Sequence, residues 1–86
     1  MIEFDVDTAR LALAAGTGEI VTKAGEPVEI TCWDTGPEYT FYKLIGNIKS
    51  PLPMFERRGV SWSRDGKYLM SGGDSENDLV IKPTIT

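Results

Sequence analysis

The sequence predicts a mainly β (α+β) protein, with one short N-terminal helix followed by about six antiparallel strands that curl into a small barrel or sandwich. The chain has 86 residues, enough for one domain, which we expect to span residues 1–86. Hydrophobic residues make up 41% and charged residues 26%, a globular composition that argues against disorder. After Gly18, hydrophobic residues recur at every second position in short runs separated by turn residues, which is typical of antiparallel sheets.

The N-terminal segment carries the only helical pattern. Asp5 or Asp7 could accept a hydrogen bond from the first-turn amides and so begin the helix. The spacing places three apolar residues on one face, namely Val6, Ala9 and Leu13. The glycines on either side of Thr17 end the pattern, because glycine readily adopts the left-handed conformation of a C-cap. A helix of about ten residues is marginal alone, so it must dock on the sheet, and we expect Phe4 and Leu13 to anchor it.

Short strands are predicted over residues 19–23, 27–33, 39–45, 57–63, 68–70 and 79–81. Gly25 suits the turn of a first hairpin, and Asp65-Gly66 is typical of the turn of a second. The run 27–33 alternates most clearly, with Val28, Ile30 and Cys32 on one face and Glu29, Thr31 and Trp33 on the other. Segment 47–54 contains two prolines and is predicted to be an irregular edge or a loop.

Several absences exclude whole classes of chemistry. The chain contains no histidine and a single cysteine, Cys32, which excludes imidazole acid–base catalysis, an internal disulfide and a zinc site of the usual ligands within one chain. The carboxylates of segment 74–78 resemble the start of a calcium loop, but Leu79 stands where that loop needs glycine. We therefore predict a solvated acidic loop there. We expect a protein that is not an enzyme and that has no cofactor and no metal site.

No run approaches the ~20 apolar residues that span a bilayer. The start of the chain includes Glu3 and Asp5, where a signal peptide carries positive charge. The single thiol is compatible with a reducing compartment. We therefore expect a cytoplasmic protein with no membrane partner.

Several short motifs resemble those of a group of small uncharacterised β-rich proteins encoded by bacteria and their phages. They are a Phe-Asp helix start at Phe4-Asp5, a closing Asp-Gly-x-Tyr at 65–68 with an acidic Asp-Leu ending over 75–79, and the stretch 18–30. That stretch is similar to the family's Gly-x-x-Val-x-Thr-x-x-Gly-x-x-Val hairpin, although Ala24 departs from the aspartate usual in its turn. The resemblance implies a compact β-rich fold and an origin in a phage or other mobile element. It implies no catalytic residues.

Positive charge and aromatic rings concentrate in residues 39–68. This segment has six basic and two acidic residues, a net charge of +4, and six of the eight aromatic residues. Cations that follow phosphates and rings that stack on bases are what a single-stranded nucleic-acid surface needs. The residues in question are Lys43, Lys49, Arg57, Arg58, Trp62 and Tyr68. The simpler interpretation places the rings in the core and the cations at sheet edges, and the total charge of −4 repels a polyanion, so nucleic-acid binding is our alternative hypothesis.

Our leading hypothesis is a non-enzymatic binding module that acts by protein–protein recognition or self-association. Trp33 projects from the strand face opposite Val28 and Ile30, and exposed large aromatic residues often mark partner sites. The predicted partner-binding residues are Trp33, Tyr42, Phe55 and Trp62. The competing interpretation is that the helix covers Trp33.

Overall fold

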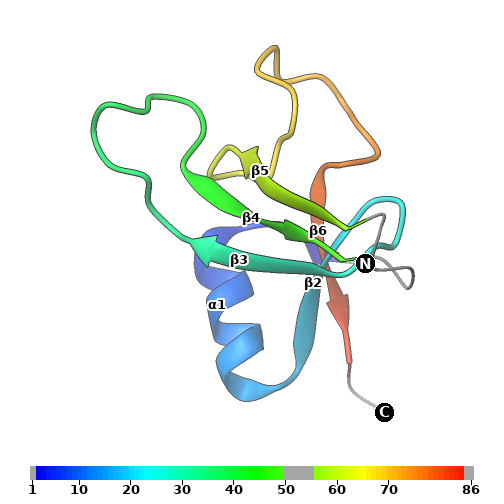
Figure 1. Cartoon of the computed structure of the whole chain (residues 1–86). Coiled ribbons are helices and arrows are strands. Elements are labelled where there is room, and N and C mark those ends of the chain that lie inside the picture. The colour runs from blue at the N-terminus through cyan, green and yellow to red at the C-terminus, as the bar shows by residue number, and fades with distance from the viewer. Residues whose placement is uncertain (1, 50–55, 85–86) are drawn as a thin grey trace.

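The computed structural model describes residues 2–49 and 56–84. Within these residues the chain forms one helix and six strands (Figure 1). In chain order the elements are β1 (Ile2–Glu3), α1 (Val6–Ala15), β2 (Gly18–Thr22), β3 (Val28–Cys32), β4 (Leu44–Ile48), β5 (Arg57–Trp62) and β6 (Leu79–Pro83). The mainly β content and the single helix are confirmed, although β1 precedes the helix. No helix in this part of the chain is long and apolar enough to cross a membrane.

The six strands divide into two three-stranded sheets. β6 lies between β1 and β2 in the first sheet, and β4 lies between β3 and β5 in the second. Every pairing is antiparallel, as predicted. Figure 1 shows the strands of the second sheet running across β2 and β6. The described strands do not close into a barrel, so the fold prediction is confirmed as far as two antiparallel sheets and one helix.

Helix α1 begins and ends where its capping residues predict. The carboxylate of Asp5 accepts hydrogen bonds from the N–H and the hydroxyl of Thr8, both at 3.0 Å. Gly16 ends the helix in the left-handed conformation, with φ 69°. The sequence had left Asp5 and Asp7 open as N-caps, and the structure selects Asp5.

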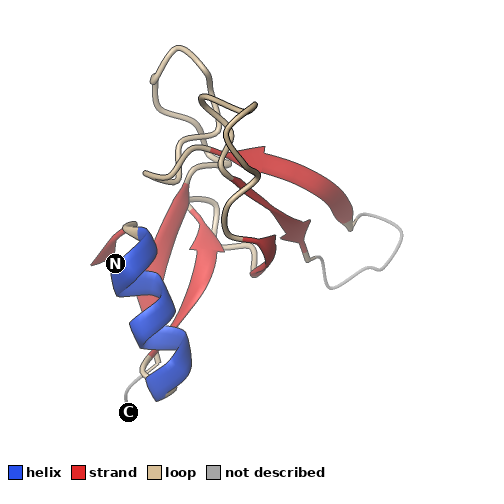
Figure 2. Cartoon of the chain, turned by 90° about the vertical axis from the view of Figure 1, so that its left-hand side faces the viewer, coloured by secondary structure: helices blue, strands red, loops and turns tan. Residues whose placement is uncertain are grey.

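The helix packs against the first sheet (Figure 2). Val6 and Ala9 are buried there, and Phe4, just before the helix, is only 5% exposed. The prediction that Leu13 is a second anchor is wrong, because its side chain is 46% exposed. Ala12 takes that place instead: a Cβ added to Gly18 would lie 3.1 Å from the Cβ of Ala12.

The predicted first hairpin is wrong, although its turn forms. Gly25 has φ 91°, and Thr22 closes the turn by donating its N–H to the carbonyl of Glu26 at 2.9 Å. β2 and β3 then enter different sheets, and only an isolated bridge joins Val21 to Pro27. Proline has no N–H with which to continue a ladder. β2 therefore pairs with β6, and the turn becomes the link between the sheets.

Strand β4 begins later than predicted, at Leu44, and residues 39–43 form the end of a loop. Thr35 holds this loop in place. Its hydroxyl donates to the carbonyl of Tyr42 at 2.7 Å, and its N–H donates to the carbonyl of Lys43 at 3.2 Å. These hydrogen bonds hold the segment in a closed loop, so residues 39–43 do not adopt the predicted strand.

The predicted return strand over residues 68–70 is also wrong. The turn that precedes it forms, with Gly66 at φ 80°. However, the N–H of Tyr68 donates to the carboxylate of Asp78 at 2.8 Å, and the carbonyl of Gly66 accepts from Leu79. The chain is thus held at the start of β6 and does not pair with β5.

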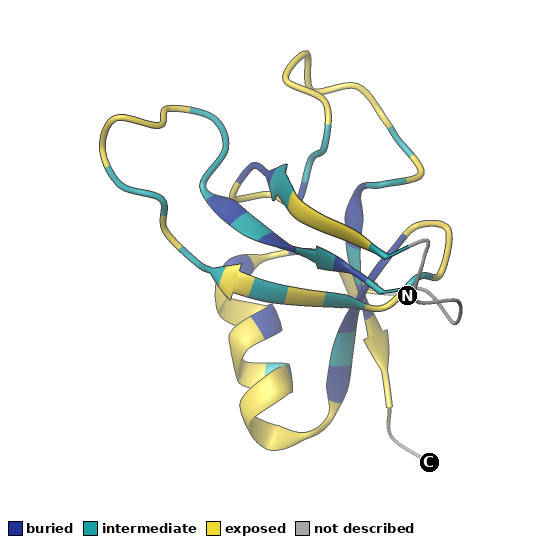
Figure 3. Cartoon of the chain, viewed as in Figure 1, coloured by how far each residue is buried: buried dark blue, intermediate teal, exposed yellow. Residues whose placement is uncertain are grey.

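One buried cluster joins the helix and both sheets (Figure 3). Its members are Phe4, Val6, Ala9, Ile20, Leu44, Ile48, Trp62, Leu79 and Ile81. Trp62 is 0% exposed, and its indole N–H donates to the carbonyl of Asn77 at 2.7 Å. The prediction that Trp62 contacts a partner or a base is therefore wrong, because its ring is part of the core.

Candidate anion-binding site

Most cationic side chains of this protein pair with carboxylates. Salt bridges within 4.0 Å involve Lys23, Lys49, Arg57, Arg58, Lys67 and Lys82. The other three of the nine basic residues are Arg10, Lys43 and Arg64, and among the described residues none of them has a carboxylate partner within that distance. Among the described residues, these three cations therefore lack the close carboxylate contact that the other six have, although Arg64 lies near enough to Asp5 to help the hydrogen bonds from Thr8 lower the pKa of that carboxyl.

All three unpaired cations line the same hollow, which has a volume of about 370 Å³ and is completed by Trp33 and Asp34. We call these five residues the cationic hollow. Arg10 comes from α1, Trp33 and Asp34 follow β3, Lys43 precedes β4, and Arg64 follows β5. The hollow thus forms where the helix meets one end of the second sheet.

Arg10 and Trp33 hold each other in place. The guanidinium carbon of Arg10 lies 5.6 Å from the centre of the Trp33 ring, a cation–π distance. The partly buried Trp33 also packs against the core cluster. The interpretation that the helix covers Trp33 is confirmed in part, since Arg10 lies over a ring that still lines a surface hollow, and contact of Trp33 with a partner stays a prediction.

Lys43 is positioned by the loop between β3 and β4. Its ammonium group donates to the carbonyl of Gly36 at 2.8 Å, which leaves two of its three N–H donors. The carboxylate of Asp34 accepts a hydrogen bond from the N–H of Gly36 at 3.0 Å and so stabilises the same loop. Gly36 itself requires a φ of 103°, which a residue with a side chain rarely adopts.

Arg64 lies in a tight turn after β5. The N–H of Gly66 donates to the carbonyl of Ser63 at 2.9 Å, and the N–H of Lys67 donates to the Ser63 hydroxyl at 3.0 Å. A Cβ on Gly66 would come within 2.8 Å of the Phe4 ring. Packing on Phe4 therefore fixes the turn from which Arg64 extends.

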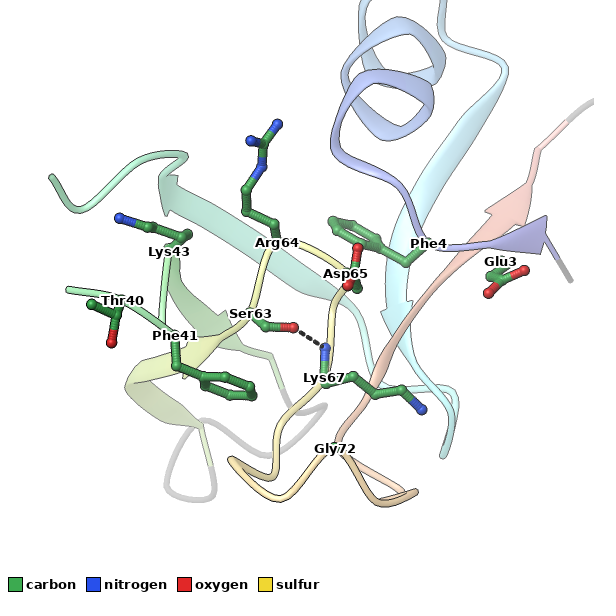
Figure 4. A pocket seen from close by; sticks show the side chains of 10 residues that line it. All are labelled: Glu3, Phe4, Thr40, Phe41, Lys43, Ser63, Arg64, Asp65, Lys67 and Gly72. Carbon is green, nitrogen blue, oxygen red and sulfur yellow. Dashed lines mark hydrogen bonds between the residues drawn. The ribbon is translucent and has the colours of Figure 1, made fainter. Parts of the chain in front are cut away.

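A second hollow of about 580 Å³ adjoins the first and shares Lys43 and Arg64 with it. Figure 4 shows Phe41 and Phe4 on opposite sides of this adjoining hollow. Its lining also includes the carboxylates of Glu3 and Asp65, neither of which forms a salt bridge among the described residues. Each hollow is lined by three cationic residues, and the adjoining hollow has two carboxylates where the cationic hollow has one.

The structure does not bring the predicted partner-binding residues together on one surface. Trp33 lines the cationic hollow. Tyr42 is partly buried; its hydroxyl donates to the carbonyl of Tyr68 at 3.2 Å, and its ring meets Phe41 edge-on at 4.8 Å. Trp62 is in the core, and Phe55 lies outside the described residues.

The predicted nucleic-acid set does not form one uncompensated surface. Lys43 lines the cationic hollow, Trp62 is buried and Tyr68 is partly buried. The remaining three are paired: Lys49 and Arg58 share Glu56 at 2.8 and 3.2 Å, and Arg57 pairs with Glu26 at 2.9 Å, so two carboxylates offset part of the three positive charges. The hydrogen bonds from Lys49 and Arg58 hold the pKa of Glu56 below its usual value.

The prediction of a solvated acidic loop is wrong for Asp78, which is only 2% exposed, and it holds for Asp74, whose side chain is 85% exposed. The carboxylate of Asp78 accepts the N–H groups of Tyr68 and Ser75, at 2.8 and 3.0 Å, and lies 3.5 Å from Lys23 and 3.6 Å from Lys67. Burial acts to raise the pKa of Asp78, but these donors and charges outweigh it, so the pKa lies below the ordinary 3.8. The same lysines also pair with Asp74. We call Lys23, Lys67, Asp74 and Asp78 the lysine clamp; no metal-binding cluster occurs among the described residues.

Sequence reasoning missed Arg10 and Arg64 as site residues. Arg64 belongs to the basic segment 39–68, so its charge was a usable signal. Arg10 lies in the acidic N-terminal part of the chain, and only the packing of α1 brings it to Trp33. Comparisons of this chain with protein-family models, with curated proteins and with solved structures gave no significant match.

Proposed function

We propose that this protein is a non-enzymatic binding module that acts by protein–protein recognition, and that an acidic segment of its partner binds in the cationic hollow. The observation that carries the proposal is that the three cations with no carboxylate within 4.0 Å in residues 2–49 and 56–84 line one hollow beside Trp33. Tryptophan and arginine dominate the energetic hot spots of protein interfaces. A second copy of this acidic chain, with its net charge of −4, is one such partner.

Three sequence predictions belong to the same proposal. The lack of histidine supports a role in recognition without catalysis. A cytoplasmic location and an origin in a phage or mobile element follow from the sequence patterns alone. We also propose that the two sheets act as layers of a small sandwich, since one buried cluster joins them.

The test compares a short rhodamine-labelled peptide rich in glutamate with the same peptide carrying glutamine at those positions. By fluorescence polarisation at low ionic strength, we expect binding of the glutamate peptide only. Arg64→Glu should abolish it, whereas Arg58→Glu should preserve it, because Arg58 is exposed and already pairs with Glu56. Equal loss in the two variants, or equal binding of the two peptides, would overturn the proposal. Light scattering after gel filtration separates self-association from a foreign partner.

A second candidate function is binding of single-stranded nucleic acid. It is favoured by Phe41, which adds a ring beside Lys43 and Arg64 in the adjoining hollow. The polarisation assay with labelled oligothymidylate tests it, because each phosphate contact steepens the dependence of log K on log salt by about 0.7. Binding of oligothymidylate in preference to the glutamate peptide would replace the leading proposal.

A further inference from the structure

The charges and hydrogen-bond donors of the cationic hollow indicate which anionic group fits it best. Building on the proposed function, we propose that the hollow is a phosphoryl-group site that receives a phosphorylated side chain of a partner protein. It contains three cations and one carboxylate, and that carboxylate, of Asp34, is engaged by the N–H of Gly36. A phosphorylated side chain carries a charge of about −1.5 to −2 and three strong acceptor oxygens. Glutamate offers one charge and two oxygens, which leaves one cation unmatched.

Contacts within the protein restrain the side chains of Arg10 and Lys43, and the backbone from which Arg64 extends, before a ligand arrives. The stack on Trp33 restrains Arg10 at 5.6 Å, and the 2.8 Å hydrogen bond to Gly36 restrains Lys43. Arg64 extends from a turn closed by hydrogen bonds and by packing on Phe4. Binding therefore loses less side-chain entropy than it would at mobile surface lysines. A guanidinium can also bind two phosphate oxygens at once.

The surroundings favour one phosphoryl group over a polyanion. Arg10 lies over the Trp33 ring, and this partly buried residue also packs against the core cluster, so the ring offers a base less stacking area than an exposed ring does. A nucleic-acid strand that continued into the adjoining hollow would bring further phosphates toward Glu3 and Asp65, and the additional cation there, Lys67, already pairs with Asp74 and Asp78. A peptide avoids this repulsion if an apolar or basic residue next to its phosphorylated residue lies against Phe41 and these carboxylates.

Three pools of rhodamine-labelled peptides test this inference. The pools share random flanking residues and differ at a central position, which is phosphoserine, glutamate or serine. At constant ionic strength we expect the phosphoserine pool to bind about tenfold or more tightly than the glutamate pool, since charge-assisted hydrogen bonds are the strong ones. Equal binding of these two pools would overturn the phosphoryl proposal and leave acidic-segment recognition intact. Binding of oligothymidylate but of no pool would overturn both, as would the absence of any binding.

Matched variants locate the site. Arg10→Gln and Arg64→Gln should each weaken binding of the phosphoserine pool by about tenfold, because each removes donors that face the phosphoryl oxygens. Arg58→Gln is the control, since this arginine is exposed and pairs with Glu56. Circular dichroism and the urea midpoint confirm that each variant folds. Equal weakening in all three variants would show a general charge effect and overturn the assignment.

Discussion

Two clusters of cations in this protein differ in what surrounds them. In the lysine clamp, Lys23 and Lys67 face the buried carboxylate of Asp78 and the exposed carboxylate of Asp74. In the cationic hollow, the cations meet an aromatic ring and a single carboxylate that is engaged by its own loop. The first cluster uses its charge to hold the start of β6 to the turn after β5. The cations of the second cluster have no carboxylate within salt-bridge distance among the described residues, so residues of the same charge serve structure in one place and, in our proposal, recognition in the other.

We expect the largest loss of stability when the lysine clamp is disrupted by substitution of Asp78. Asp78→Ala should lower the free energy of unfolding by about 2–4 kcal/mol, because it leaves the part-buried N–H groups of Tyr68 and Ser75 without an acceptor and removes the buried one of the two carboxylates that face the lysines. Urea denaturation measures this loss. Asp74→Ala is the control: its side chain is 85% exposed, so we expect little change although it pairs with the same lysines. Equal losses would mean that burial does not distinguish the two carboxylates.

The clamp should also make stability depend on acid pH. The folded-state pKa of Asp78 lies below its usual 3.8, so its carboxylate form stabilises the fold. That contribution is complete above about pH 5 and is lost as the pH falls through the folded-state pKa. Unfolding curves across this range should therefore show a smaller acid loss for Asp78→Asn than for the natural protein. The same slope in both proteins would exclude Asp78 as a source of the pH dependence.

We expect a smaller effect when a carboxylate is removed from a salt bridge, which tests whether the cations it pairs with can then bind phosphate groups. Glu56→Gln removes the carboxylate that pairs with Lys49 and Arg58. We expect the variant to gain severalfold in affinity for oligothymidylate at low salt, because two cations lose their counter-charge. Fluorescence polarisation measures the gain, with Glu76→Gln as a charge-matched control, since Glu76 is exposed and forms no salt bridge among the described residues. No difference between the variants would mean that pairing does not limit the available charge.

The fold could be predicted where local residues decide the conformation. The caps at Asp5 and Gly16, the turn at Gly25 and the alternation of β3 follow from neighbouring residues. The sheet partners could not be predicted in this way, because β2 leaves its neighbour β3 to pair with β6, more than fifty residues later in the chain. The strand expected after Gly66 failed for the same reason, since a distant carboxylate, Asp78, binds its backbone.

The candidate site could be predicted only in part. Alternation along β3 pointed to Trp33, and the basic segment contained Lys43 and Arg64. Whether a cation is neutralised depends on contacts between distant residues, as in the pairing of Arg57 with Glu26. The packing of α1 brings Arg10 to the site, and the residues next to Arg10 in the sequence do not indicate this position.

The chain has four arginines, of which two line the cationic hollow and two form salt bridges with glutamates. One NMR spectrum can therefore compare the two kinds of arginine. Phosphoserine is titrated at constant ionic strength while the side-chain Nε–Hε NMR signals of Arg10, Arg57, Arg58 and Arg64 are followed. We predict that the signals of Arg10 and Arg64 shift together with one dissociation constant, while those of Arg57 and Arg58, which pair with Glu26 and Glu56, stay in place. Similar shifts of all four signals, or shifts of Arg57 and Arg58 alone, would contradict the claim that the cationic hollow is where this protein binds anions.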